Sequence, residues 1–267
     1  MELAGRKALL TGATGGLGRA IAEALAERGA IVQLSARNRA ALEELAASLP
    51  GGEHEVLPAD LDEPGAAEKL AAEAGEVDVL VANAGLPAAG QVDDFTSEQL
   101  SRALRVNLES PMLMARALYP AMLERGSGHL VFVSSLAGKA ASPGSAIYNA
   151  TKFGLRGFAL ALRMDLGPRG VGVSVVAPGF IREAGMFADA GAKPPAPLGT
   201  AKPEAVGAGV VRAIERDKLE VVVAPPIDRF LSHFALTSPV VADRIQSGSR
   251  GQEASRAIAE GHPPEKR

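Results

Sequence analysis

Two side chains with complementary acid–base chemistry stand four positions apart, at Tyr148 and Lys152. They lie in the alanine-rich segment 146–167, which is expected to be helical, and residues four apart share one face of an α-helix. A phenol with a pKa of about 10 is a poor proton donor or acceptor near neutral pH. A fixed ammonium group one turn away favours the phenolate and is expected to lower that pKa. The pair therefore predicts a tyrosine that works as a general acid or base.

A serine completes this set of polar side chains. The apolar run 130–133 ends in Ser134 and Ser135, thirteen residues before Tyr148. In open sheets of parallel strands, ligands bind beyond the carboxyl ends of the strands. We therefore expect Ser135 to share a pocket with the tyrosine and the lysine.

The first expected strand runs into a glycine-rich turn that opens a helix. Glycines at such a place allow a tight turn, let the backbone approach a pyrophosphate, and leave the helix N-terminus open to the anion. The spacing is G-x-x-x-G-x-G rather than the G-x-G-x-x-G of the general dinucleotide pattern, and a purely structural turn is the alternative. The residues of the turn are Thr11, Gly12, Ala13, Thr14, Gly15, Gly16, Leu17 and Gly18.

The end of the second expected strand bears on which dinucleotide is bound. A carboxylate there would accept hydrogen bonds from a ribose 2′-hydroxyl and indicate NAD, but the sequence has Ser35, Ala36 and Arg37. A guanidinium group and a hydroxyl can bind a 2′-phosphate. We therefore expect NADP(H) to be preferred, with NAD(H) as the second choice. The alternative is that Arg37 and Arg39 are solvated charges at the start of a helix.

Short β-branched runs alternate with Ala/Leu/Glu-rich segments as far as about residue 225. This alternation predicts an α/β fold, a single doubly wound Rossmann domain whose seven-stranded, mainly parallel sheet has helices on both faces. The expected strands are 7–11, 31–35, 55–58, 77–82, 129–133, 172–177 and 219–223. The expected helices are 16–28, 39–49, 64–74, 97–125, 146–167 and 203–216. Pro64 and Pro203 are expected at the first helical position, and Thr96 with Gln99 in a capping box.

One stretch, residues 180–200, is rich in glycine and proline and follows a strand. It is too long for an ordinary connection, so we expect a lid over the ligand, with an irregular surface loop as the alternative. Its apolar side chains favour an apolar substrate. They are Phe180, Met186, Phe187 and Leu198.

Beyond an expected catalytic domain of residues 1–225, the apolar residues of segment 226–247 recur at helical spacing, and this helix is expected to end near Ser238. Packing on its own domain, a subunit contact and a membrane-surface contact are the alternatives for this extension. Residues 248–267 are expected to form a polar tail.

Composition argues against several other classes of protein. The 267 residues carry a formal net charge of −3, with 4% aromatic residues, no tryptophan and no cysteine. Disulfides and cysteine nucleophiles are thereby excluded, and nucleic acid is not an expected partner. The four histidines share no metal-ligand spacing, so no metal site is expected. Neither a signal peptide nor a membrane span is indicated, and a cytoplasmic location is expected.

These motifs, taken in order, resemble those of the short-chain dehydrogenase/reductase family in its compact form. The T-G-x-x-x-G-x-G turn and the Y-x-x-x-K pair carry most of the resemblance, which extends from Thr11 to about Val223. The other matching positions are Asp60-Leu61, Asn83-Ala84-Gly85, Asn107, Ser135 and Pro178-Gly179.

The resemblance implies hydride transfer between NAD(P)(H) and a carbonyl/alcohol pair. Tyr148 would be the proton donor in reduction and the base in oxidation, and Ser135 would hold the substrate oxygen. Lys152 would bind the nicotinamide ribose and lower the tyrosine pKa, while Asn107 would position a water that links Lys152 to solvent. Further cofactor contacts are implied for Asp60, Leu61, Asn83, Ala84, Gly85, Pro178, Gly179 and Ile181.

One position departs from the family pattern. Where the family usually has a threonine that binds the nicotinamide carboxamide, this chain has Glu183. A carboxylate can accept a hydrogen bond from the amide but cannot donate one. Its charge near the pyrophosphate is unfavourable unless Arg182 offsets it.

Two other functions remain as alternatives. A non-catalytic NADP-binding sensor or scaffold would share the fold, and sugar-nucleotide epimerases and dehydratases use the same Tyr/Lys pair, although with a larger C-terminal domain. The resemblance also implies a small-molecule substrate and a homodimer or homotetramer formed through the helices 97–125 and 146–167.

Overall fold

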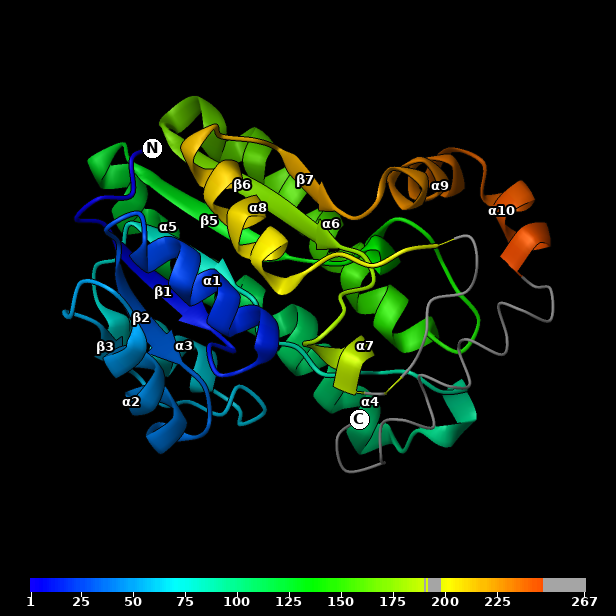
Figure 1. The fold of residues 1–267 in the computed structure, drawn as a ribbon, viewed down its shortest axis with the longest axis horizontal. Coiled ribbons are helices and arrows are strands. Elements are labelled where there is room, and N and C mark those ends of the chain that lie inside the picture. The colour runs from blue at the N-terminus through cyan, green and yellow to red at the C-terminus, as the bar shows by residue number, and fades with distance from the viewer. Residues whose placement is uncertain (190, 192–197, 247–267) are drawn as a thin grey trace.

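The computed structural model describes residues 1–189, 191 and 198–246. Its centre is one sheet of seven strands in the order β3-β2-β1-β4-β5-β6-β7 (Figure 1). Every neighbouring pair in this sheet is parallel. The strands are β1 Lys7–Thr11, β2 Ile31–Ser35, β3 Glu55–Val56, β4 Val79–Ala82, β5 Gly128–Val133, β6 Val171–Pro178 and β7 Glu220–Val223. The doubly wound α/β fold predicted from the sequence is confirmed.

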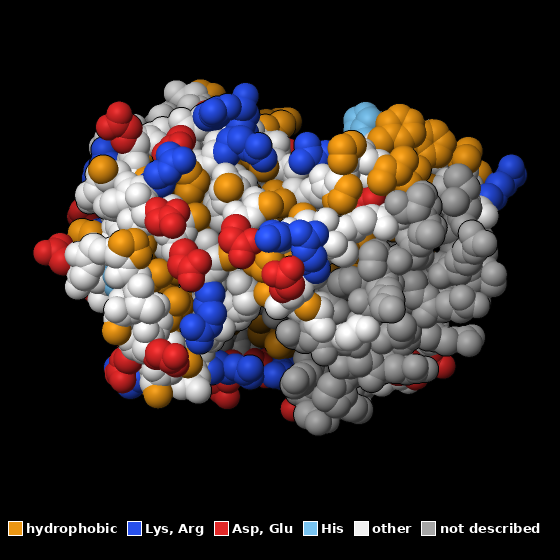
Figure 2. Space-filling view, viewed as in Figure 1, with side chains coloured by type: hydrophobic (Ala, Val, Ile, Leu, Met, Phe, Trp, Pro, Cys, Tyr) orange, Lys and Arg blue, Asp and Glu red, His pale blue; other side chains and the backbone are white. Residues whose placement is uncertain are grey.

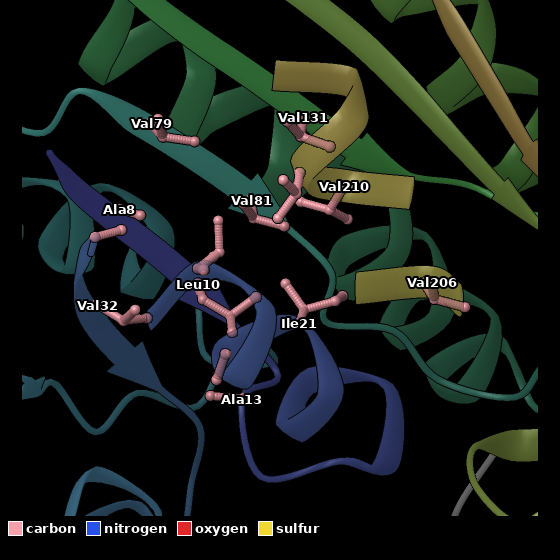
Figure 3. Close-up of a cluster of buried hydrophobic side chains, with 14 of the residues drawn as sticks. Ala8, Leu10, Ala13, Ile21, Val32, Val79, Val81, Val131, Val206 and Val210 are labelled. Carbon is pink, nitrogen blue, oxygen red and sulfur yellow. The ribbon is translucent and has the colours of Figure 1, made fainter. Parts of the chain in front are cut away.

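Both faces of the sheet are buried under apolar clusters. Successive side chains of a strand point to opposite faces, so a strand can contribute to both clusters. In β1, Ala8 and Leu10 belong to one apolar cluster and Leu9 to the other. Figure 3 shows the first cluster, in which Leu10 lies among side chains from neighbouring strands and from two helices. This burial explains why the strands are apolar throughout rather than alternating.

Each face is covered by its own set of helices. The first cluster includes side chains from α1 Gly16–Ala26, α2 Arg39–Ser48 and α8 Pro203–Glu215. The second includes side chains from α3 Ala66–Ala74, α5 Ser110–Arg125 and α6 Ala146–Leu166. The chain crosses from the first set to the second between β1 and β4, which are adjacent in the sheet although two strands and three helices separate them in the sequence.

Two helix predictions are wrong in detail. The expected helix 97–125 is divided into α4 Ser97–Leu104, a π-helical turn Arg105–Glu109, and α5. Pro64 is not at a first helical position, because α3 begins at Ala66 after Gly65, whose φ of 80° is left-handed. Pro203 does open α8, and the capping box of Thr96 and Gln99 is present at α4.

The extension after β7 contains two helices rather than one. α9 Pro226–Thr237 ends before Ser238, and Pro239 begins α10 Pro239–Gln246. Both lie beyond the carboxyl end of β7, away from the helices that cover the sheet (Figure 1). α9 buries Asp228, Ser232 and Ala235 against the rest of the chain, so one of its faces packs on its own domain. The predicted polar tail, 248–267, lies outside the described residues.

A buried polar network joins β5 and β6 to the segment that precedes β7. His129 in β5 is 3% exposed, and its Nε2 lies 2.8 Å from the hydroxyl oxygen of Ser174 in β6. That hydroxyl donates to the carbonyl oxygen of Lys218 at 2.6 Å. Burial lowers the pKa of His129 to about 4, with the nearby carboxylate of Asp217 opposing the shift.

Protein stability should therefore fall as the pH decreases from about 6.5 to about 4. In this window the unfolded histidine binds a proton that the folded one does not, so protonation favours the unfolded chain. The loss from this group is on the order of 3 kcal/mol. Urea unfolding at several pH values should show a smaller loss for His129→Gln than for the native chain, whereas His233→Gln, at an exposed position of α9, is the control. Parallel pH profiles for the native chain and His129→Gln would contradict the assignment.

Candidate active site

The carboxyl ends of β1 and β4 are joined by a set of four hydrogen bonds. The Thr11 hydroxyl oxygen accepts from the backbone N–H groups of Asn83 and Ala84, both at 3.1 Å. In return, Nδ2 of Asn83 donates to the carbonyl oxygens of Thr11 at 3.0 Å and Gly12 at 3.3 Å. These bonds hold Thr11 and Gly12 against Asn83 and Ala84 at the base of the crevice between the two halves of the sheet.

The glycine turn is needed for steric reasons. Gly12 has a φ of +67°, and a Cβ there would lie 2.9 Å from Cα of Ala84. A Cβ at Gly18 would collide with the carbonyl oxygen of Gly12, and one at Gly16 would collide with the side chain of Ala184. α1 has neither a side-chain cap nor an acidic residue in its first turn. Its N-terminus thus offers the close, positively polarised backbone that a pyrophosphate requires.

One cleft of about 940 Å³ unites nearly all the predicted site residues. At one end it is lined by Ser35, Arg37, Asp60 and Leu61, at the other by Ser135, Tyr148 and Lys152, with the glycine turn between them. The remaining predicted residues that line it are Thr11, Gly12, Thr14, Gly15, Gly16, Leu17, Gly18, Asn83, Ala84, Gly85, Pro178, Gly179, Ile181, Phe180, Met186 and Leu198.

Tyr148 and Lys152 meet on one face of α6, as their spacing predicts. Nζ of Lys152 lies 5.7 Å from the centre of the Tyr148 ring and donates to the carbonyl oxygen of Val133 at 3.0 Å. Lys152 is 3% exposed, whereas Tyr148 is partly open to the cleft. Ser135, just after β5, shares a hydrogen bond with the Tyr148 hydroxyl, and its own oxygen accepts from the N–H of Ala137 at 3.1 Å.

We expected Lys152 to lower the pKa of Tyr148. In the protein without a bound ligand this expectation is wrong, because the pKa of Tyr148 is raised. Burial raises the pKa of Tyr148 to about 12, and the hydrogen bond from Ser135 only partly opposes it. Burial also lowers the pKa of Lys152 to about 8. Desolvation outweighs the attraction that the spacing suggests, because both charged forms lose water in this site. The phenol is therefore protonated at neutral pH, and Lys152 is largely charged.

Asn107 lies behind the cleft rather than in its wall. It is fully buried in the π-helical turn. Its Oδ1 accepts from the N–H of Leu86 at 2.6 Å, and its Nδ2 donates to the carbonyl oxygen of Leu86 at 3.0 Å. These bonds fix the chain just after Gly85, next to Nζ of Lys152. The amide thus positions this segment, and its expected role in holding a water stays a prediction.

The first part of the predicted lid lies against the glycine turn. Ala184 sits next to Gly16, and α7 Met186–Asp189 follows. Glu183, which departs from the family pattern, has a φ of 73° and forms an ion pair with Arg182 at 3.1 Å. The offset of its charge by Arg182 is therefore present. The side chain of Phe187 and residues 190 and 192–197 lie outside the described residues.

Within the described part of the chain, no three His, Asp or Glu side chains gather as metal ligands would. A search of the same residues finds no helix with the length and apolarity to span a bilayer.

The parallel sheet, the glycine turn at its switch point and the cleft beyond its strand ends define a Rossmann-type dinucleotide-binding protein. Comparison with known families agrees, since a family model described as short chain dehydrogenase matches residues 6–194. The chain belongs to the short-chain dehydrogenase/reductase family and is an oxidoreductase.

Two relatives and one solved structure illustrate the similarity. The chain is 35% identical to ketoacyl reductase HetN of Nostoc sp. strain PCC 7120 over 254 residues, covering 91% of this chain and 88% of the relative. It is 37% identical to 3-oxoacyl-(acyl-carrier-protein) reductase FabG of Escherichia coli strain K12, over 68% of this chain and 75% of that one. A short-chain dehydrogenase from Sphingobium yanoikuyae, solved in complex with NADPH, superimposes with a TM-score of 0.76 at 28% identity, over 89% and 95% of the two chains.

The steric requirement at Gly18 can be tested by Gly18→Ala. The added methyl group must displace the Gly12 carbonyl, so we expect a stability loss of about 1–3 kcal/mol and at least tenfold weaker NADPH binding. Thermal unfolding and titration of NADPH fluorescence measure the two effects. Gly157→Ala is the matched control, because nothing lies within 4 Å of its Cβ position in α6. Native-like NADPH affinity in Gly18→Ala would contradict the role of the turn.

Proposed function

We propose that the protein is an NADP-preferring reductase that interconverts a carbonyl and an alcohol on an apolar substrate. The observation that carries the proposal is the meeting of Ser135, Tyr148 and Lys152 in the same cleft as the glycine turn. The names of two relatives, a ketoacyl reductase and a 3-oxoacyl-(acyl-carrier-protein) reductase, make keto-acyl compounds the first substrates to test.

The residues of the cleft fit a bound NADP(H). A Cβ would fill the cradle at Gly16 and Gly18, and when bound, NADP(H) would supply or accept the hydride. In reduction, the substrate carbonyl becomes an alkoxide that needs a hydrogen-bond donor and a proton. Ser135 would donate the hydrogen bond to that oxygen, and Tyr148 would transfer its phenolic proton to it. Lys152 would hold positive charge beside the resulting phenolate.

Protonation in the site favours the reductive direction. With a pKa of about 12, Tyr148 carries its proton at neutral pH and is ready to act as an acid. Oxidation would first require the phenolate, which the buried site disfavours unless further positive charge arrives. The oxidised cofactor's charged ring would be such a group.

The cofactor preference rests on the end of β2. Ser35, Ala36 and Arg37 line the cleft there, and Arg37 is exposed. A 2′-phosphate would meet a guanidinium group instead of the carboxylate that NAD would favour. The NADPH bound by the Sphingobium yanoikuyae dehydrogenase supports this proposal.

We further propose that residues 1–225 form the catalytic domain and that two copies or four associate through α5 and α6. Apolar side chains on these helices support the association, since Met164 is 78% exposed and Phe153 and Met112 are 37% and 36% exposed. The second candidate function is a sensor that binds NADP without turnover. It would share every feature of the glycine turn, and turnover by the native chain separates the two.

Tyr148→Phe removes the proposed proton and leaves the ring in place. We expect kcat for NADPH-dependent reduction of a keto-acyl thioester to fall at least 100-fold, with Kd for NADPH within threefold of native. Tyr119→Phe, which changes the other tyrosine of the chain, is the control. Undiminished turnover in Tyr148→Phe would refute the mechanism, and NADPH binding by the native chain without turnover on a broad carbonyl panel would favour the sensor.

Arg37→Asp tests the cofactor preference. The substituted carboxylate repels a 2′-phosphate and accepts hydrogen bonds from a 2′-hydroxyl, so the ratio of kcat/KM for NADPH to that for NADH should fall at least tenfold. Arg39→Asp is the control, because Arg39 pairs with Glu43 on α2 and does not line the cleft. An unchanged ratio in Arg37→Asp would remove Arg37 from the cofactor site.

A further inference from the structure

The inner face of α9 forms part of the cleft, at the end away from the glycine turn. Leu231, Phe234 and Ala235 of α9 and Ala242 of α10 line it together with Phe180 and Leu198. The opposite face of α9 is exposed, with Ile227 at 42% and Phe230 at 66% exposure, and hydrophobic side chains gather over this part of the molecule in Figure 2. A substrate bound in the cleft would therefore contact the extension at the inner face of α9.

This apolar wall contains one buried carboxylate. Asp228 lines the cleft although it is 2% exposed. Its oxygens share a single backbone donor, the N–H of Gly199, at 3.3 and 3.4 Å. Among the described residues no lysine, arginine or histidine forms an ion pair with it. A carboxylate has about four acceptor positions, so most of its hydrogen-bonding capacity is unused.

A hydroxyl group lies one helical turn further on. Ser232 also lines the cleft, is 4% exposed, and donates to the carbonyl oxygen of Arg229 at 2.9 Å. Its remaining capacity is as an acceptor. Asp228 and Ser232 together give an apolar wall a small patch of acceptors, toward which the described residues direct one donor, the N–H of Gly199.

Burial of such a carboxylate is costly. Its position in the first turn of α9 offsets part of the cost through the helix dipole, yet desolvation still raises the pKa of Asp228 above its ordinary value. A buried acidic group that faces a ligand cleft and lacks a strong partner is typical of a binding site.

We propose that Asp228, with Ser232 beside it, is a specificity-determining site that accepts a hydrogen bond from a hydroxyl or ammonium group of the substrate, remote from the reacting carbonyl. The inference rests on the proposed function only in placing that carbonyl at Tyr148. The substrate class is then an extended apolar ketone or keto-acyl compound with a polar donor at its distal end.

The test measures binding to the protein loaded with NADPH, so it does not depend on turnover. The probes are 2-alkanones of increasing chain length and their ω-hydroxy and ω-amino counterparts, titrated by isothermal calorimetry. At one chain length, the native protein should bind an ω-substituted compound at least tenfold more tightly than the alkanone. Asp228→Leu should abolish or reverse this preference, whereas Asp243→Leu, at an exposed position of α10, should keep it.

Asp228→Asn removes the negative charge but retains an oxygen that can accept from the Gly199 N–H. It therefore distinguishes the hydroxyl compounds from the ammonium compounds. It should keep part of a preference for the hydroxyl compound and lose a preference for the ammonium compound. Equal weakening of all compounds in the Asp228 variants would show that the residue only anchors residue 199, and would overturn the proposal. The absence of any ω-preference in the native protein would also overturn it.

Turnover of the same compounds tests the proposed function separately. A distal preference in binding without reduction would refute the reductase and keep the Asp228 site. Reduction without such a preference would keep the reductase and refute the site.

Discussion

The link between Thr11 and Asn83 is the constraint on which the rest of the site depends. The paired register of β1 and β4 ends at Leu10 and Val81, and beyond it the chain leaves the two strands toward opposite faces of the sheet. The Thr11 hydroxyl accepts two backbone N–H groups from the β4 side, and the Asn83 amide donates to two carbonyl oxygens on the β1 side. Because these groups satisfy one another, the crevice can be open above them without leaving buried backbone atoms unpaired.

Burial accounts for both the stability of the fold and the chemistry of the site. The strands are apolar on both faces, and this leaves little room for charge except at the strand ends. Lys152 is placed at such an end, with one strong acceptor in Val133 and almost no exposure. The same desolvation that shifts its pKa downward shifts that of Tyr148 upward. The site therefore holds a protonated Tyr148 phenol beside the Lys152 ammonium group, whose pKa is lowered. In this state the phenol can act as a proton donor.

The sequence was sufficient to predict the fold and the placement of the glycine turn with Ser135, Tyr148 and Lys152 in one cleft, because strand and helix periodicity, the glycine turn and the Tyr/Lys spacing are local signals. It could not predict the π-helical turn at Asn107 or the bonds that Asn107 makes there, since their partner is the backbone of Leu86, 21 positions away. Nor could spacing alone give the direction of the Tyr148 pKa shift, because desolvation depends on everything that surrounds the ring. The part of α9 in the cleft was missed for a similar reason. Its amphipathic pattern was evident, but a pattern does not say which surface the inner face will meet.

The described parts of the segment between β6 and α8 line the cleft on both sides of the residues that are not described. Its base is closed by backbone bonds, from the N–H of Ala201 to the carbonyl oxygen of Phe180 at 2.9 Å and from the N–H of Arg182 to the carbonyl oxygen of Ala201 at 3.0 Å. Beyond this base, Ala184 lies against Gly16, where the pyrophosphate is expected, and Gly199 is bonded to Asp228. Ala184 also lines the cleft, so a ligand bound at the glycine turn would have this residue as a neighbour. Because the base is held by these backbone bonds, Phe180 and Ala201 stay side by side while the described residues beyond them contact the glycine turn through Ala184 and α9 through Gly199.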